Sequence, residues 1–323
     1  MTATHRPLAG PPVTQWHRPL LLLAIAMAIL VVVSIGGMIV DDRVLTGLPI
    51  WAKSVKFALS TLIYAVTWAW LIAQLTRWRR FAWWAGTVAA VGLGVELVII
   101  VVQIARGTTS HFNFTTPLNA ALWNTMGASI IGVWTATVLV AAALFLNPTA
   151  DRARTSAIRA GAVLSVIGAA LGMLMTSPTS AQMASDSMII GAHTVGLADG
   201  GPGLPILGWS TVGGDLRVPH FLGMHALQVI PLVLIALELA ARRFPVLGSV
   251  QKRRAISLVV TATYGALLAV LTWQALRGQS VVHPDSQTGL ALGGIALAAT
   301  VSVVLVLRAR LTFAAPVAIG GAR

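Results

Sequence analysis

Long apolar runs, each sufficient to cross a lipid bilayer, constrain this 323-residue chain more than any other feature. A bilayer core of roughly 30 Å needs about 20 helical residues, because a helix rises about 1.5 Å per residue. The runs are continuous and do not alternate, which indicates helices and not barrel strands. We therefore predict an all-α, polytopic transmembrane helix bundle of about eight spans, at residues 19–40, 57–75, 81–105, 118–146, 156–176, 218–240, 256–276 and 289–307.

Composition excludes the soluble classes of protein. Charged residues make up 10% of the chain and hydrophobic residues 57%, with a mean hydropathy of +0.84, whereas a soluble domain has about 25% charged residues. The chain has no Cys, which excludes disulfides and thiolate metal sites. Soluble enzymes, disulfide-rich secreted scaffolds and disordered regulators are therefore excluded.

The basic residues predict the orientation of the chain in the membrane. If the N-terminus is cytoplasmic, 16 of the 22 Lys and Arg residues lie on the cytoplasmic side, as the positive-inside rule requires. We assign the net charge of +13 to this asymmetry, so the expected partner is the bilayer and not a nucleic acid. Both termini are expected in the cytoplasm. The chain then divides into a cytoplasmic tail (1–17), a first four-helix half (18–155), a second half (156–308) with a long outer loop (177–217), and a second cytoplasmic tail (309–323).

Two spans end in the same Q-x-x-R-G motif, at 103–107 and at 274–278. The same offset, within one residue, pairs His111 with His283 in the loops that follow. This similarity predicts a 4+4 internal repeat, with both halves inserted in the same orientation, as in parallel-repeat transporters. The alternative is chance matching between apolar segments of low complexity.

Glu96 is the most informative single residue, because it lies ten residues before the outer end of its span. An ionisable group at that depth normally faces a partner or a water-filled cavity. Gln103 lies seven residues further on and returns to the same helical face. Glu96 is therefore a candidate catalytic acid or base, with Gln103 as a candidate ligand-binding residue.

A second polar segment, GGDLRVPHFLGMHALQ at 213–228, opens the sixth predicted span. His220 and His225 are candidate catalytic groups or proton relays within this segment. Asp215, Arg217 and Gln228 are candidate ligand-binding residues. The alternative for these two histidines is a structural role, because an imidazole within a membrane span often forms a hydrogen bond to a neighbouring helix.

Further candidate ligand-binding residues lie near the outer ends of other spans. His111 and Asn113 belong to the short loop RGTTSHFNFTTPLN at 106–119, in which Thr116 and Pro117 are expected to begin the next helix. Lys56 could meet Glu96, Asp215 or an anionic ligand. Gly168 and Gly172 form a GxxxG motif that predicts close helix packing.

The motif RG-x-x-SHFN at 106–113, together with the segment at 213–228, resembles a widespread group of bacterial polytopic membrane proteins. The resemblance covers mainly residues 96–119 and 213–228. It implies a multi-pass protein of the bacterial plasma (inner) membrane, and it implies no particular catalytic activity.

Most polar side chains fall in the outer halves of the predicted spans or in the outer loops. This asymmetry predicts a polar, outward-opening intramembrane site that binds a small or lipid-soluble ligand, with acid–base or cofactor-assisted chemistry as an extension. One alternative is a redox protein in which His225 and His111 ligate haem b or a metal ion. The other alternative is a secondary transporter built on the 4+4 plan.

Overall fold

The computed structural model describes residues 11–149 and 151–309, and its architecture is all-α. Seven helices are long and apolar enough to cross a membrane, or eight spans if one bent pair is counted as a span. The spanning helices are α1 (Arg18–Val40), α2 (Ala52–Ala73), α3 (Arg79–Ala105), α4 (Pro117–Leu146), α5 (Arg152–Leu171), α9 (Val250–Leu276) and α10 (Ser286–Arg308), and the bent pair is α7 (Arg217–Met224) with α8 (Ala226–Ala240).

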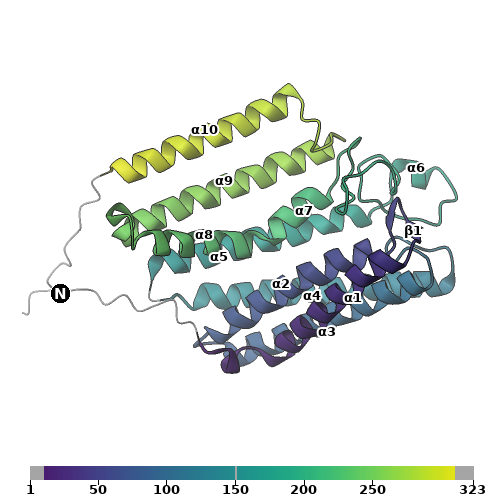
Figure 1. The fold of residues 1–323 in the computed structure, drawn as a ribbon, viewed down its shortest axis with the longest axis horizontal. Coiled ribbons are helices and arrows are strands. Elements are labelled where there is room, and N and C mark those ends of the chain that lie inside the picture. The colour runs from purple at the N-terminus through teal and green to yellow at the C-terminus, as the bar shows by residue number, and fades with distance from the viewer. Residues whose placement is uncertain (1–10, 150, 310–323) are drawn as a thin grey trace, which may run out of the picture.

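The remaining elements are short and lie between or before these helices. They are the 3₁₀ helices η1 (Val13–Gln15), η2 (Gly172–Thr176) and η3 (Pro245–Gly248), the helix α6 (Ser180–Met183), and the antiparallel strands β1 (Val44–Leu45) and β2 (Leu48–Pro49). Figure 1 shows α6 and β1 at the same end of the bundle. We call this the loop-rich end, and it comprises residues 41–51, 106–116, 177–216 and 277–285.

Side-chain caps explain where several helices begin. The Thr116 hydroxyl accepts a hydrogen bond from the Asn119 N–H, and Pro117 occupies the first turn of α4, so the expected start of this helix is confirmed. Asp151 and Asp285 cap α5 and α10 through their carboxylates in the same way. These caps satisfy backbone N–H groups that a helix leaves unpaired.

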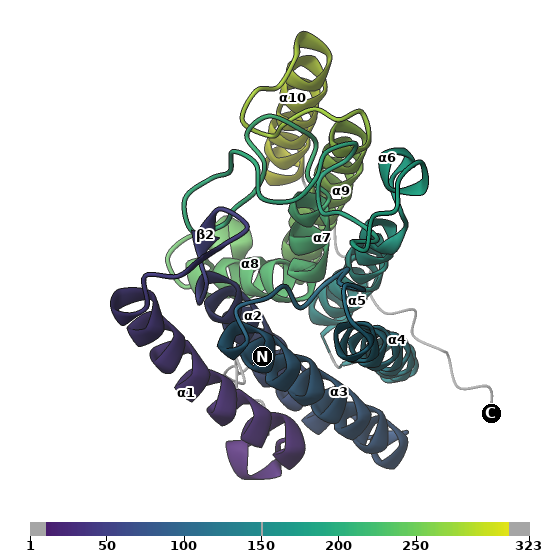
Figure 2. The ribbon, with the colours of Figure 1, turned by 90° about the vertical axis from the view of Figure 1, so that its right-hand side faces the viewer.

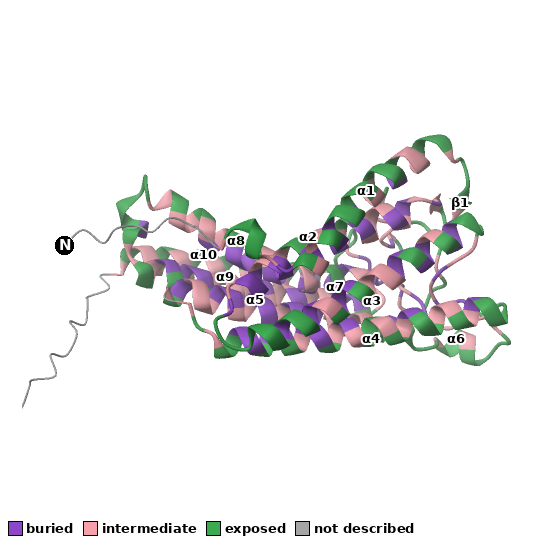
Figure 3. Ribbon diagram, turned by 90° about the horizontal axis from the view of Figure 1, so that it is seen from below, coloured by how far each residue is buried: buried purple, intermediate pink, exposed green. Residues whose placement is uncertain are grey.

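The helices pack as two groups that follow the chain. Helices α1 to α4 pack with one another, and α5 packs with α7, α8 and α9 (Figures 1 and 2). Helix α4 packs against α5, which joins the groups, while α10 lies at the edge of the bundle against α9. Buried residues concentrate where the helices face one another, and exposed ones line the outer surfaces (Figure 3).

Glycine permits the closest helix crossing in the bundle, between α5 and α7. A Cβ atom added to Gly168 would lie 2.2 Å from the carbonyl carbon of Gly223. Gly172, one turn further along the chain, faces the imidazole of His220 in the same way, with a Cβ 2.8 Å from the ring. The close packing predicted from the GxxxG motif is therefore confirmed.

The sixth predicted span is not one straight helix. Helices α7 and α8 meet at His225 with a bend of 47°. The Tyr264 hydroxyl donates to the Leu222 carbonyl at 2.6 Å, and the Ser165 hydroxyl donates to the Met224 carbonyl at 3.0 Å. Side chains from α9 and α5 thus satisfy carbonyl groups beside the break, which makes a bend tolerable at membrane depth.

Candidate functional site

Glu96 and His111 meet at the loop-rich end of the bundle. Glu96 lies on α3 and is 4% exposed, and its Oε1 is 3.9 Å from the Nε2 of His111. This separation exceeds a hydrogen bond, and the second carboxyl oxygen, Oε2, is buried with no hydrogen-bond partner in the described chain. A buried carboxyl oxygen without a partner is costly and is typical of a functional site.

Aromatic side chains form the walls around His111. Its ring centroid lies 5.5 Å from that of Phe57 on α2 and 5.3 Å from that of Trp123 on α4. Phe112 is 5.8 Å away, and its φ of 62° places its backbone in the left-handed region that favours glycine. The imidazole is therefore held between rings from three segments of the chain.

A histidine–aspartate pair, which sequence analysis did not identify, lies beside His111. The His193 Nδ1 is 2.6 Å from Oδ2 of Asp199, and the His193 backbone N–H donates to Oδ1 at 3.0 Å. The His193 and His111 ring centroids are 6.3 Å apart. The only sequence signal was the presence of both residues in one Gly-rich outer loop, which does not predict where that loop packs.

Two lysines on α2 have different environments. Lys53 lies within electrostatic reach of Asp199 and Glu96, and its Nζ is 5.6 Å from the centroid of the Phe57 ring. Lys56, which the sequence singled out, donates from Nζ to the carbonyl of Leu207 at 2.8 Å and thus holds the long loop. Lys53 is therefore the lysine that belongs with Glu96.

Burial controls the protonation of the two loop histidines. Burial lowers the pKa of His111 well below its usual value, and the neighbouring charges of Lys53 and His193 lower it further. Burial also lowers the pKa of His193, and this effect outweighs the hydrogen bond to Asp199. For Asp199, burial is the largest single effect and would raise the pKa, but the hydrogen bonds from His193 and the nearby charges of His193 and Arg217 together outweigh it and lower the pKa.

Gln103 and Asn113, two predicted ligand-binding residues, direct their polar groups into the loop that carries His111. Gln103 is fully buried and donates to the Thr109 carbonyl at 3.2 Å and to Asn119 at 3.1 Å. Asn113 donates to the same carbonyl at 3.0 Å. These amides fix the position of the loop and therefore act on the site through His111.

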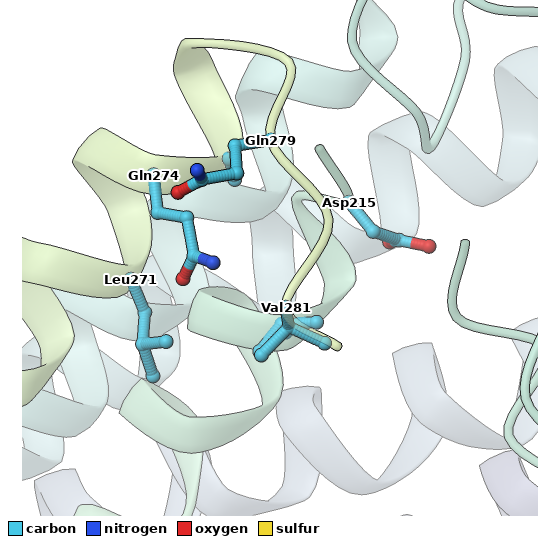
Figure 4. A pocket seen from close by; sticks show the side chains of 7 residues that line it. Asp215, Leu271, Gln274, Gln279 and Val281 are labelled. Carbon is cyan, nitrogen blue, oxygen red and sulfur yellow. The ribbon is translucent and has the colours of Figure 1, made fainter. Parts of the chain in front are cut away.

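Asp215 and Arg217 pair with each other. Their side chains are 2.5 Å apart, and the Asp215 carboxylate also accepts the Ser210 N–H at 2.8 Å. Figure 4 shows Asp215 with Gln274 and Gln279 beside a pocket of about 10 Å³, which has room for about one water molecule. Asp215 and Arg217 thus support the long loop from within.

A larger cavity of about 220 Å³ lies within this same loop. Its walls include Thr194, Ala198 and Gly200, the immediate chain neighbours of His193 and Asp199, and also the side chain of Arg217. A space of this size has room for several water molecules. The His193–Asp199 pair therefore borders on space that water or a small ligand can occupy.

His220, His225 and Gln228 lie apart from Glu96 and His111. The Nδ1 of His220 is 2.7 Å from the Gly168 carbonyl, so this imidazole joins α7 to α5. His225 lies at the helix break, where its Nε2 is buried and without a partner, and Gln228 donates to Thr67 on α2 at 3.2 Å. Among residues 11–149 and 151–309, no hydrogen bond, ion pair or ring contact connects these three with Glu96 or His111.

The described histidines and carboxylates do not form a set of ligands for a metal ion. Within the described ranges, no group of three or more His, Asp or Glu side chains could hold a metal ion. Comparisons with protein-family models, curated proteins and solved structures gave no match for the chain.

Proposed function

We propose that the protein binds a small or lipid-soluble ligand at the loop-rich end, in a site formed by Glu96, His111 and Lys53, and exchanges protons with it. Glu96 is the buried acid or base, His111 lies beside its carboxyl group, and Lys53 supplies a hydrogen-bond donor. Phe57 and Trp123 offer apolar ring faces to the ligand.

The observation that carries this proposal is the environment of the Glu96 carboxyl group. Its Oε2 is buried without a partner among the described residues, and its Oε1 is 3.9 Å from an imidazole that aromatic rings enclose. Structural carboxylates in a membrane are normally satisfied by hydrogen bonds or ion pairs. An unsatisfied carboxyl group beside a positioned imidazole is the arrangement expected of proton transfer to or from a bound molecule.

Flat apolar walls and a few polar groups favour a planar ligand that carries oxygen atoms. Aromatic rings pack well against another ring, and Lys53 can donate to an oxygen that Glu96 or His111 also approaches. We infer that the ligand class is a lipid-soluble ring with carbonyl or hydroxyl groups. A short-chain benzoquinone and its hydroquinone are suitable probes of this class.

Equilibrium dialysis of the two probes against detergent-purified protein tests the proposal. The chain has two glutamates, so Glu238→Gln is a matched control for Glu96→Gln. Loss of a hydrogen bond to a charged group should weaken binding by about tenfold or more in Glu96→Gln alone. No binding to the wild-type protein, or equal affinity in the two variants, would contradict the proposal.

A secondary transporter is the second candidate, and the break at His225 favours it. Transporters of repeat construction place broken helices beside their substrate sites, and α7 and α8 bend by 47° at a histidine whose Nε2 has no partner. The bend also supplies the interrupted span that the sequence did not predict. Flux of the hydroquinone probe into proteoliposomes, abolished by Glu96→Gln, would identify transport, whereas binding without flux would exclude it.

We also infer the 4+4 repeat and the orientation that the sequence predicted. Both Q-x-x-R-G corners close in the same way: Gln103 donates to the carbonyl six residues later, and Gln274 does the same to Ser280. Gly107 and Gly278 both have a positive φ, of 69° and 73°. These likenesses support a common origin for the two halves. The excess of Lys and Arg on one side supports an orientation with both termini cytoplasmic and the loop-rich end outside the plasma membrane.

A further inference from the structure

We propose that Asp199, His193 and His111 form a proton relay that connects the surface of the loop-rich end with Glu96. This proposal rests on the proposed function of Glu96 and adds to it the source of the protons. Proton exchange with the medium is thereby confined to one end of the bundle.

The four side chains form a gradient of exposure from the surface inward. The exposed fraction of the side chain alone is 23% for Asp199, 16% for His193, 15% for His111 and 5% for Glu96. The first two residues come from the long loop, the third from the short loop, and the last from the interior of α3. Ionisable groups of decreasing exposure therefore lead from solvent to a group inside the membrane span.

The distances between these groups suit stepwise transfer. Asp199 and His193 are in direct hydrogen-bond contact at 2.6 Å, and the 3.9 Å between His111 and Glu96 leaves a gap that a small rotation of the carboxyl group closes. The two imidazole rings, with centroids 6.3 Å apart, require one intervening water molecule. Imidazole suits this role because one ring nitrogen can accept a proton while the other releases one.

Each step moves one proton and leaves the carriers unchanged. A hydronium ion at the loop surface protonates Asp199 and becomes water, and Asp199 passes a proton to Nδ1 of His193 while Nε2 of His193 releases its own. His193 passes a proton through the bridging water to His111, and His111 then protonates the Glu96 carboxylate. Asp199 accepts a hydrogen bond from Nδ1 of His193 and stabilises its transient positive charge.

The surrounding charges favour a mobile proton over a trapped one. Lys53 approaches the cluster from α2, and Arg217 and His220 approach His193 from α7. These groups repel a positive imidazole, and burial lowers the pKa of both His111 and His193 in the same direction. A proton that arrives on either ring is therefore driven onward to a carboxylate.

Water for the outer step has a place in the structure. The cavity of about 220 Å³ is lined by Thr194 and Ala198, which are the chain neighbours of His193 and Asp199. A purely structural role would instead have Asp199 brace the loop, since it also accepts the backbone N–H of His193. The two roles differ in their kinetics. If His193 is a relay, free imidazole in the buffer should restore the rate of proton transfer in a variant that lacks this side chain. If the pair only stabilises the loop, free imidazole should have no effect on that rate.

A pH jump in a stopped-flow infrared spectrometer tests the relay on the full chain. Labelling with ¹³C-glutamate isolates two carboxyl groups, and Glu96→Gln identifies the band of Glu96. We expect His193→Gln to slow the protonation of Glu96 by about 100-fold, the scale of a lost acid–base catalyst. Free imidazole should restore the rate, and His283→Gln, which replaces an exposed histidine of another outer loop, should leave it unchanged.

The results separate the relay from the site it serves. Equal protonation rates in the wild type and His193→Gln, or a slow rate that imidazole does not restore, would overturn the relay. If the benzoquinone probe then still requires Glu96, the proposed function stands without the relay. If the probe binds Glu96→Gln as well as the wild type, the proposed function itself fails, whatever the protonation rate.

Discussion

At the scale of single residues, the structure separates side chains that build the loop-rich end from side chains left free to react. The side chains of Gln103, Asn113 and Lys56 donate hydrogen bonds to loop carbonyls or neighbouring amides. The Glu96 Oε2 has no partner in the described chain. Chemistry is therefore expected at Glu96, while changes to the amides should act through the position of His111.

Stability should fall as the pH decreases from about 7 to 5. The pKa of His111 and His193 lies below its ordinary value in the folded protein, so below about pH 6.5 the unfolded chain binds more protons than the folded one. The lowered pKa of Asp199 preserves its contribution throughout this range. Thermal unfolding in detergent across this pH range measures the effect.

The matching variants locate this pH dependence. In a His111→Gln, His193→Gln double variant the unfolding temperature should depend less steeply on pH over the same range. His283→Gln serves as the control, because this exposed histidine is outside the cluster. An unchanged slope in the double variant would show that other groups are responsible.

At the scale of helices, small residues and hydrogen bonds from the side chains of neighbouring helices determine how α7 and α8 are placed. Gly168 lets α5 approach Gly223, and Tyr264 satisfies a carbonyl beside the break at His225. The sequence predicted the close packing, because a GxxxG motif is a local pattern. The break was not predictable, because it depends on partners from α5 and α9 that are distant in the sequence.

Gly168→Ala should destabilise the protein. Its new Cβ would lie 2.2 Å from the backbone of Gly223, and separating the helices to relieve such overpacking costs roughly 1–3 kcal/mol. Gly127→Ala, on α4, is the matched control because nothing lies within 4 Å of its added Cβ. Thermal unfolding of the two variants in detergent should show a large decrease for Gly168→Ala only, and equal values would contradict the packing.

Tyr264→Phe should disturb the break without unfolding the bundle. The variant removes the hydrogen bond to the Leu222 carbonyl, which is worth about 1 kcal/mol. The only other tyrosine, Tyr64, bonds to Thr137 away from the break, so Tyr64→Phe is the control. In ¹⁵N-histidine NMR spectra the His225 signals should move in Tyr264→Phe alone; equal shifts in both variants would argue against this support.

At the scale of the whole molecule, the continuous apolar runs predicted most of the fold but not the details of the loops. The first predicted span, 19–40, agrees closely with α1, whereas α2 begins at Ala52, a full turn before the predicted 57. The first residues of α2 were not predicted to be helical because they include Lys53 and Lys56, and a polar helix end has a sequence like that of a loop. His193 and Asp199 could not be found, since long-range backbone pairs such as Asn113 with Ile189 place their loop.

The predicted orientation has a direct consequence for fusion proteins. With both termini in the cytoplasm, a fluorescent protein fused after Arg323 should fluoresce. Alkaline phosphatase, which folds only in an oxidising compartment, should be active when inserted in the loop near Asp186. The reverse pattern of the two reporters would invert the bundle and place the Glu96 site at the cytoplasmic surface.

The environment of Glu96 is the most direct test of the whole account. Because the chain has two glutamates, ¹³C-glutamate NMR of the detergent-solubilised protein gives one side-chain carboxyl signal for Glu96 and one for Glu238. We predict that the benzoquinone and hydroquinone probes move the Glu96 signal and leave that of Glu238 unchanged, and that His111→Gln moves the Glu96 signal in the absence of probe. A Glu96 signal that responds to neither change would contradict a shared ligand site at the loop-rich end.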